Sequence, residues 1–157
     1  MNLSHLDASG RARMVDIGAK PVTARSAVAE GAIRMSAPAC RLVADQALAK
    51  GDVLATSEVA GTLAAKRTAE LIPLCHPLGL DHLAVTATVD ETLPGVRVRA
   101  EARATGRTGV EMEVLTAVAV ALLNVYDMVK SADRAMEIEA IRLVEKTGGA
   151  SGDWHRP

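Results

Sequence analysis

Aromatic side chains are almost missing from this sequence of 157 residues, which contains no Phe, one Tyr and one Trp. Proteins that bind single-stranded nucleic acids stack bases on such rings, so their absence disfavours this class. An excess of basic charge is missing as well, because 18 Lys and Arg stand against 19 Asp and Glu. A long polyanion normally requires a concentrated basic face. We therefore expect no nucleic acid among the partners.

Cysteines and long apolar runs are also scarce. The two cysteines, Cys40 and Cys75, form no CxxC motif and are too few for a disulfide framework. The chain has no run of about 18 apolar residues, and its first residues lack the apolar core of a signal peptide. These absences predict a cytoplasmic protein without a membrane partner.

Alanine is abundant instead, at 29 of 157 residues. With Val, Leu, Ile and Met it has to build the core, without the roughly 150–250 Å² that one large aromatic side chain buries. Such a core suggests that further apolar surface is buried against another copy of the chain. The length fits a single domain over residues 1–157, which we expect to carry a flexible arm at 1–20 and a flexible tail at 147–157.

Alternating apolar residues predict strands, and a 3.6-residue period predicts helices. We predict strands over 21–35, 83–89, 96–104 and 136–146. The first should contain a bulge near Gly31, and the last a register break after Ala140. The predicted helices include Val59 and Leu63 on an apolar side, and cover 36–51, 52–71 and the buried segment 110–132. This order favours an α+β fold, specifically a ferredoxin-like sandwich with a mostly antiparallel sheet and helices packed on one face.

The segment Leu74–Leu78 contains the first candidate for chemistry, His76. Pro73 and Pro77 fix the backbone around it, which suits a proton-transfer group, although a structural role is about as favoured by the sequence alone. The neighbouring Cys75 is expected to be packed rather than reactive. We expect no metal site, because the other histidines are scattered without ligand spacing.

Two acidic residues, Glu111 and Glu113, enter the most apolar segment. They can stabilise the N-terminus of a helix by their charge. Alternatively they precede the helix in extended backbone and face a site together, because residues two apart share a side only in a strand-like conformation.

The same segment ends with a second charged pair, Asp127 and Lys130. Their spacing places them on one helix face, where a surface ion pair contributes little. The apolar surroundings favour a second interpretation, a partly desolvated pair whose pKa values are tuned for proton transfer.

Lysine is rare, with five residues against 13 arginines, so each lysine is a candidate for a specific role. Lys146 precedes Gly148 and Gly149, whose backbone amides could approach an anion. Arg97, Arg99 and Arg103 share one face of a predicted strand with Glu101, and we interpret them as a solvated face or a subunit contact.

Two long motifs, LIPLCHPL at 71–78 and TGVEMEVLT at 108–116, are specific enough to indicate a family. Shorter motifs lie at His5–Asp7, Ala12–Asp16, Thr23–Arg25, Lys50–Val53, Ala65–Thr68, Val125–Met128 and Lys146–Gly149. On these residues the chain resembles, nearly from end to end, the cyclic pyranopterin monophosphate synthase family of molybdenum cofactor biosynthesis.

The resemblance implies a lyase that converts (8S)-3',8-cyclo-7,8-dihydroguanosine 5'-triphosphate to cyclic pyranopterin monophosphate and releases pyrophosphate. It implies no redox cofactor, and the sequence does not indicate whether Mg²⁺ accompanies the pyrophosphate. It also implies a homohexamer, a trimer of dimers with the active site between subunits, and a functional link to a radical SAM enzyme upstream. Two departures from relatives are Ala150, where a lysine is common, and Val129, where a small or sulfur-containing residue is common.

Residue by residue, the resemblance places the general acid/base pair at Asp127 and Lys130. It places substrate binding at Leu74, Cys75, His76, Glu111, Met112, Glu113, Lys20, Arg25, Lys50 and Lys146. Positioned cations can stabilise the charge that develops as pyrophosphate leaves, and a carboxylate beside a lysine can move protons near neutral pH.

Three other functions are alternatives, and each explains the pattern less completely. A non-catalytic module for small anions or nucleotides explains the cations and the glycines, but leaves the acidic pairs without a role. An oligomeric scaffold predicts that the charged residues point into solvent and bind nothing. A metallohydrolase requires a ligand set that the spacing of His and Cys does not provide.

Overall fold

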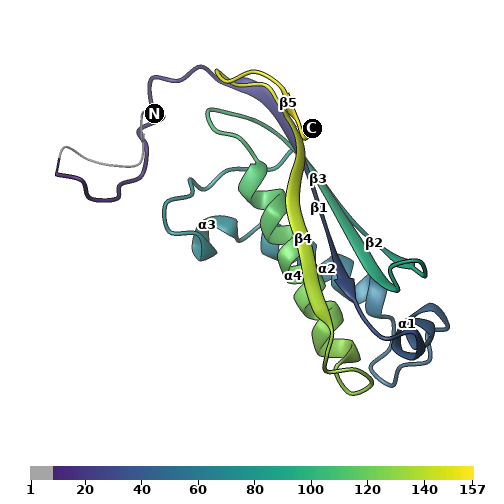
Figure 1. The fold of residues 1–157 in the computed structure, drawn as a ribbon. Helices are drawn as coiled ribbons and strands as arrows, with labels where there is room; N and C mark the ends of the chain where they lie inside the picture. The colour runs from purple at the N-terminus through teal and green to yellow at the C-terminus, as the bar shows by residue number, and fades with distance from the viewer. Residues whose placement is uncertain (1–8) are drawn as a thin grey trace.

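A five-stranded antiparallel sheet forms the centre of the computed structural model, which describes residues 9–157 (Figure 1). The strand order is β2-β3-β1-β4-β5. The strands are β1 (Thr23–Arg34), β2 (His82–Asp90), β3 (Gly95–Gly106), β4 (Glu137–Thr147) and β5 (Trp154–His155). The predicted α+β fold is confirmed, and the ferredoxin-like detail stays a prediction. The motif His5–Asp7 and the first part of the predicted arm lie outside the described residues.

The helices pack on one face of this sheet. They are α1 (Ala37–Ala44), α2 (Val53–Ala65), α3 (Thr68–Leu71) and α4 (Glu111–Val129). α4 covers β1, β3 and β4, whereas α2 covers β2 and packs along α4. The long helix α4 supplies much of the core, because Val114, Val118 and Leu122 are completely buried against the sheet.

Small residues let these layers approach closely, which explains how a core without aromatic rings is filled. A Cβ at Gly61 of α2 would lie 2.8 Å from the backbone carbonyl of Ala117 and 3.0 Å from Val85. A Cβ at Gly31 of β1 would lie 2.9 Å from Val118. Because the elements approach one another closely, small side chains fill the core and large aromatic side chains are not needed.

The irregularities predicted in two strands are confirmed. The register between β1 and β4 shifts between Glu30 and Ala32, next to Gly31. On β4 the break falls at Ala140, whose φ of 56° lies in the left-handed region that few non-glycine residues adopt.

The helices differ from the prediction in their length and exposure. The first ends at Ala44 rather than Gly51, and Gln46 just beyond it has a φ of 52°. The predicted helix over 52–71 is divided at Lys66 and Arg67 into α2 and α3. Val59 and Leu63 were predicted on its apolar side, but they are 59% and 54% exposed. Gly61 makes the close contact instead, so the buried face of α2 carries small residues.

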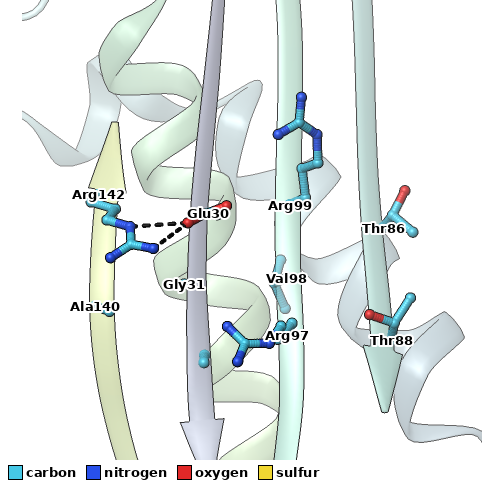
Figure 2. A pocket seen from close by; sticks show the side chains of 10 residues that line it. Glu30, Gly31, Thr86, Thr88, Arg97, Val98, Arg99, Ala140 and Arg142 are labelled. Carbon is cyan, nitrogen blue, oxygen red and sulfur yellow. Dashed lines mark hydrogen bonds and ion pairs between the residues drawn. The ribbon is translucent and has the colours of Figure 1, made fainter. Parts of the chain in front are cut away.

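The open face of the sheet, away from the helices, carries the predicted row of charged residues. Arg97, Arg99 and Thr86 surround a cavity of about 330 Å³ on this face, and Figure 2 shows the helices behind the strands. Arg142 donates to Glu30 there, with its Nε at 2.9 Å from Oε1. This cavity shares no lining residue with the pocket described below.

By length and composition alone, α4 could cross a membrane, and it is the one such helix among residues 9–157. The core helix of a globular domain passes the same test, and α4 packs against three strands and α2. Its apolar character is therefore explained by its place in the core.

Candidate active site

A pocket of about 370 Å³ lies at the N-terminal end of α4. The rigid segment after α3 forms one wall with Leu74, Cys75 and His76, and the start of α4 forms another with Glu111 and Met112. The wall opposite comes from the N-terminal segment and the loop before α4, with Val15, Ile17, Lys20, Thr108 and Gly109. Six of the predicted site residues therefore line one pocket: Leu74, Cys75, His76, Glu111, Met112 and Lys20.

Glu113 lies behind this pocket and is only 4% exposed. Its Oε1 is 3.9 Å from the thiol of Cys75, which can donate a weak hydrogen bond. Its Oε2 has no hydrogen-bond partner among residues 9–157. Burial raises the pKa of Glu113, because an apolar environment disfavours the charged carboxylate. Burial and the neighbouring Glu113 likewise raise the pKa of the Cys75 thiol, which disfavours the reactive thiolate, but Cys75 is only half-buried and lines the pocket.

Glu111 and Glu113 do not share one side of the site. Both belong to the first turn of α4 rather than to extended backbone, so their side chains diverge. Glu111 lines the pocket, whereas Glu113 lines a neighbouring cavity with Lys66 and Arg67. The prediction that they face the site together from outside the helix is therefore wrong.

The second charged cluster lies at the C-terminal end of α4 and contains Asp127, Lys130 and Lys50. Lys130 Nζ is 2.6 Å from Asp127 Oδ1, and Lys50 Nζ is 2.9 Å from Asp127 Oδ2. Lys50 also donates to the carbonyl of Asp127 at 2.7 Å, which fixes the loop before α2 to the end of α4. The hydrogen bonds from Lys130 and Lys50 lower the pKa of Asp127 to about 2.

This cluster is not desolvated in the single chain. The side chains of Asp127 and Lys130 are 56% and 51% exposed. The prediction of a partly desolvated pair is therefore wrong for one copy of the protein. The two lysines alone account for the low pKa of Asp127, and its carboxylate is ionised at neutral pH.

The two clusters are far apart along the same helix. Fourteen residues separate Glu113 from Asp127, which corresponds to about 21 Å at 1.5 Å per residue. Of α4 and its C-cap, Met112, Leu123, Asp127 and Lys130 are the exposed residues. Their spacing places them on one outward side of the helix. One copy of the chain thus presents both clusters on one side but cannot close them around one small molecule.

Arg25 and Lys146 form a third group beside the pocket. Arg25 Nε donates to the carbonyl of Gly106 at 3.2 Å. Gly106 lines a cavity of about 320 Å³ that shares Ile17 and Thr108 with the first pocket. Lys146 is aligned with Ala27 of β1, two residues after Arg25.

The glycines after Lys146 have a different role from the one predicted. The backbone N–H of Gly148 donates to Asp153 Oδ1 at 2.9 Å, so it is occupied within the chain.

The tail that was predicted to be flexible contains β5, which pairs with β4. Sequence reasoning missed the pocket residues Val15 and Ile17, although Val15 lies in a motif that supported the resemblance.

No three His, Cys, Asp or Glu side chains gather into a possible metal site within residues 9–157. The candidate site instead combines lysines and arginines with carboxylates and one histidine.

The pocket of this antiparallel α+β domain brings together Lys20, His76 and Glu111, which are groups that an enzyme can use to bind a small molecule and move protons. The model of the MoaC family matches residues 14–149, and the chain belongs to that family. A protein of Brucella ovis named cyclic pyranopterin monophosphate synthase is 58% identical, over 97% of this chain and 92% of its own. A protein of Brucella canis with the same name is 57% identical over the same shares. The resemblance predicted from the motifs is confirmed.

Proposed function

We propose that this protein is a lyase of molybdenum cofactor biosynthesis. It converts (8S)-3',8-cyclo-7,8-dihydroguanosine 5'-triphosphate to cyclic pyranopterin monophosphate and releases pyrophosphate. The observation that carries the proposal is the division of complementary groups between the two ends of α4. One end offers a pocket with the Glu111 carboxylate and a histidine, and the other offers an exposed Asp127 between two lysines.

The reaction requires both kinds of group. When the cyclic phosphate closes, an oxygen of the substrate forms a bond to the phosphorus nearest the sugar, and the bond from that phosphorus to the pyrophosphate oxygen breaks. Negative charge therefore develops on the leaving oxygen. Lysines and arginines stabilise that charge. Ring opening and reclosure require proton transfers, for which we assign Lys130 and Asp127 as acid and base. His76 and Glu111, which line the pocket, hold the part of the substrate derived from the purine.

The active site lies between two subunits of a homohexamer, a trimer of dimers. A second copy packed antiparallel along the outward side of α4 would bring its Asp127 to the pocket of the first. The residues between the two clusters support such packing, because Leu123 is 58% exposed and Ala119 and Val120 are partly exposed. Burying the Asp127 cluster in this contact would also desolvate it, which the single chain does not do.

The protein acts in the cytoplasm, on the product of a radical SAM enzyme, and uses no redox cofactor. The decisive experiment incubates the full chain with the cyclic dihydroguanosine triphosphate and measures pyrophosphate and the pterin product, with and without Mg²⁺. Release of both products supports the proposal. Binding of the triphosphate without pyrophosphate release would instead favour a non-catalytic nucleotide-binding module. Near-normal turnover by Asp127→Ala and Lys130→Ala would overturn the assignment of the acid/base pair.

A further inference from the structure

The turn between β4 and β5, residues 148–153, is packed against the start of β1. Gly148 and Gly149 both have positive φ values, 79° and 82°. A Cβ at Gly148 would overlap the carbonyl oxygen of Ala24, and a Cβ at Gly149 would overlap Nη1 of Arg25. The two glycines therefore do more than reverse the chain, since they let the turn lie directly on the Arg25 guanidinium.

Hydrogen bonds within the turn hold it in this position. Asp153 Oδ1 accepts from the N–H of Gly148 at 2.9 Å, and the N–H of Gly152 donates to the carbonyl of Gly149 at 3.1 Å. Asp153 thereby closes the turn at the point where it meets β1. The side chain of Ser26 on β1 also bonds to Thr147, with 2.7 Å between their hydroxyl oxygens.

The same turn reaches the amine of Lys146. Nζ of Lys146 makes a short hydrogen bond to Oγ of Ser151. Among residues 9–157 no carboxylate forms an ion pair with Lys146 or Arg25, so their charges are available to a ligand. A flexible lysine side chain loses conformational entropy when it is ordered, and a neutral hydroxyl can order it without cancelling its charge.

We propose that Ser151 and Asp153 are positioning residues for the anionic part of the substrate. Ser151 orients the Lys146 amine, and Asp153 holds the glycine turn that packs on Arg25. Together they present two cations from strands β4 and β1 to the phosphates. The inference rests on the proposed function and on the family resemblance, which implies that Lys146 and Arg25 bind substrate.

The contacts that dock β5 do not depend on Ser151. His155 Nδ1 is 3.3 Å from Glu145 Oε2, and Arg156 donates through its backbone N–H to the carbonyl of Val144 at 2.8 Å. A change at Ser151 should therefore leave the strand in place. His155→Gln is a matched control, because it removes a contact of the same strand without reaching Lys146 or Arg25.

The first test measures kcat, KM and the inhibition constant of pyrophosphate for Ser151→Ala, Ser151→Thr and His155→Gln. We expect Ser151→Ala to raise KM and the inhibition constant together by about three- to tenfold, the effect of one hydrogen bond, with kcat within about twofold. Ser151→Thr keeps the hydroxyl and should restore both constants. Unchanged constants in Ser151→Ala, or an equal change in His155→Gln, would overturn the role of Ser151.

The second test addresses Asp153 through Asp153→Asn and Asp153→Ala. Asn keeps an acceptor for the Gly148 N–H, so Asp153→Asn should bind pyrophosphate like the parent protein, whereas Asp153→Ala should bind about three- to tenfold more weakly. Equal binding by the parent and Asp153→Ala would contradict the proposal. Calorimetry of pyrophosphate binding does not require turnover, so it separates a failure of this inference from a failure of the proposed reaction.

Discussion

The two ends of α4 carry acidic residues in opposite environments. At the N-terminal end, Glu113 is buried beside Cys75 and one of its oxygens has no partner within residues 9–157, so its pKa is raised. At the C-terminal end, Asp127 is exposed and bonded to two lysines, so its pKa is lowered to about 2. The difference shows that environment, rather than residue type, sets the protonation state of each carboxyl group.

Each end also lacks what the other offers. The pocket end is concave and can enclose a ring system, but Asp127 lies about 21 Å away along the helix. The lysine end carries concentrated charge, but Asp127 and Lys130 line none of the cavities described above. This difference supports the proposed site, in which two copies each contribute one end.

The largest expected effect comes from disabling one end at a time. Lys130→Ala and His76→Ala should each lower pyrophosphate release by about 10²- to 10⁴-fold, because each removes a proton-transfer or binding group of the site. If the site is shared, mixing the two inactive chains during assembly restores activity. When equal amounts of the two chains pair at random, about one quarter of the sites combine an intact pocket end with an intact lysine end.

Pyrophosphate release by the mixed assembly is therefore the direct measurement. A mixture of Lys130→Ala with Asp127→Ala is the control, because both changes disable the same end and no pairing repairs it. Recovery in neither mixture would show that both ends act within one copy.

A second effect should follow from placing charge between the two ends. Leu123→Asp changes a residue that is 58% exposed in the single chain, so the fold should persist while association is lost. A charged group buried in an interface costs several kcal/mol, and we expect a folded, inactive protein of lower mass. Size-exclusion chromatography with light scattering and circular dichroism measures both properties.

Leu42→Asp on α1 serves as the control for this change, since it makes the same substitution at an exposed position off α4. A Leu123→Asp protein with the parent's mass and full activity would refute packing along this side of the helix.

A third, smaller effect concerns the buried carboxyl at the pocket end. Because the pKa of Glu113 is raised by burial, the folded chain holds this proton more tightly than the unfolded chain. Its contribution to stability therefore falls as the pH rises above about 4, the ordinary range of a glutamate. Glu113→Gln should be more stable than the parent at pH 7 by about 1–3 kcal/mol and equal to it near pH 4.

Thermal unfolding at both pH values measures this difference, and Glu111→Gln is the less buried control. A Glu113→Gln protein that is less stable than the parent at pH 7 would mean that the carboxylate has a partner in the assembly.

The smallest effect is expected at the lysine end. Removing Lys50 in Lys50→Met should raise the pKa of Asp127 from about 2 toward its ordinary value of 3.8, and Lys130→Met should raise it further because Lys130 is the larger cause. Carboxyl carbon NMR during an acid titration follows this group directly. Identical titrations of the parent and both variants would show that neither lysine bonds to Asp127 in solution.

Much of this architecture could be predicted from local sequence patterns. The antiparallel pair β2 and β3, the register shift at Gly31 and the break at Ala140 could be predicted because apolar and polar residues alternate in the strands and the alternation changes at these positions. The division of α2 from α3 at Lys66 does not, because helical periodicity continues through it. The exposure of Val59 and Leu63 also depends on contacts beyond the local sequence, since a helix pattern does not show which side meets its neighbours.

The site was predictable in composition but not in arrangement. The motifs around His76 and Glu111 indicated groups of one pocket, and the structure brings most of them together. The environments of Glu113 and Asp127 were not readable, because burial is a property of the packed chain. Glu113 is buried beside Cys75, whereas Asp127 lies on the exposed side of α4 between the buried Val125 and Met128.

The two aromatic residues are natural optical probes in two elements, Tyr126 near the C-terminal end of α4 and Trp154 in β5. Tyr126 precedes Asp127 and donates its hydroxyl to the carbonyl of Arg134 at 3.1 Å, while Trp154 pairs with Lys146 across β4 and β5. With no second Tyr or Trp, the phenol emission of each chain comes from Tyr126 and its indole emission from Trp154. An increase in energy transfer from the phenol to the indole when copies associate would therefore report how near the lysine end of one copy comes to β5 of another, without any label.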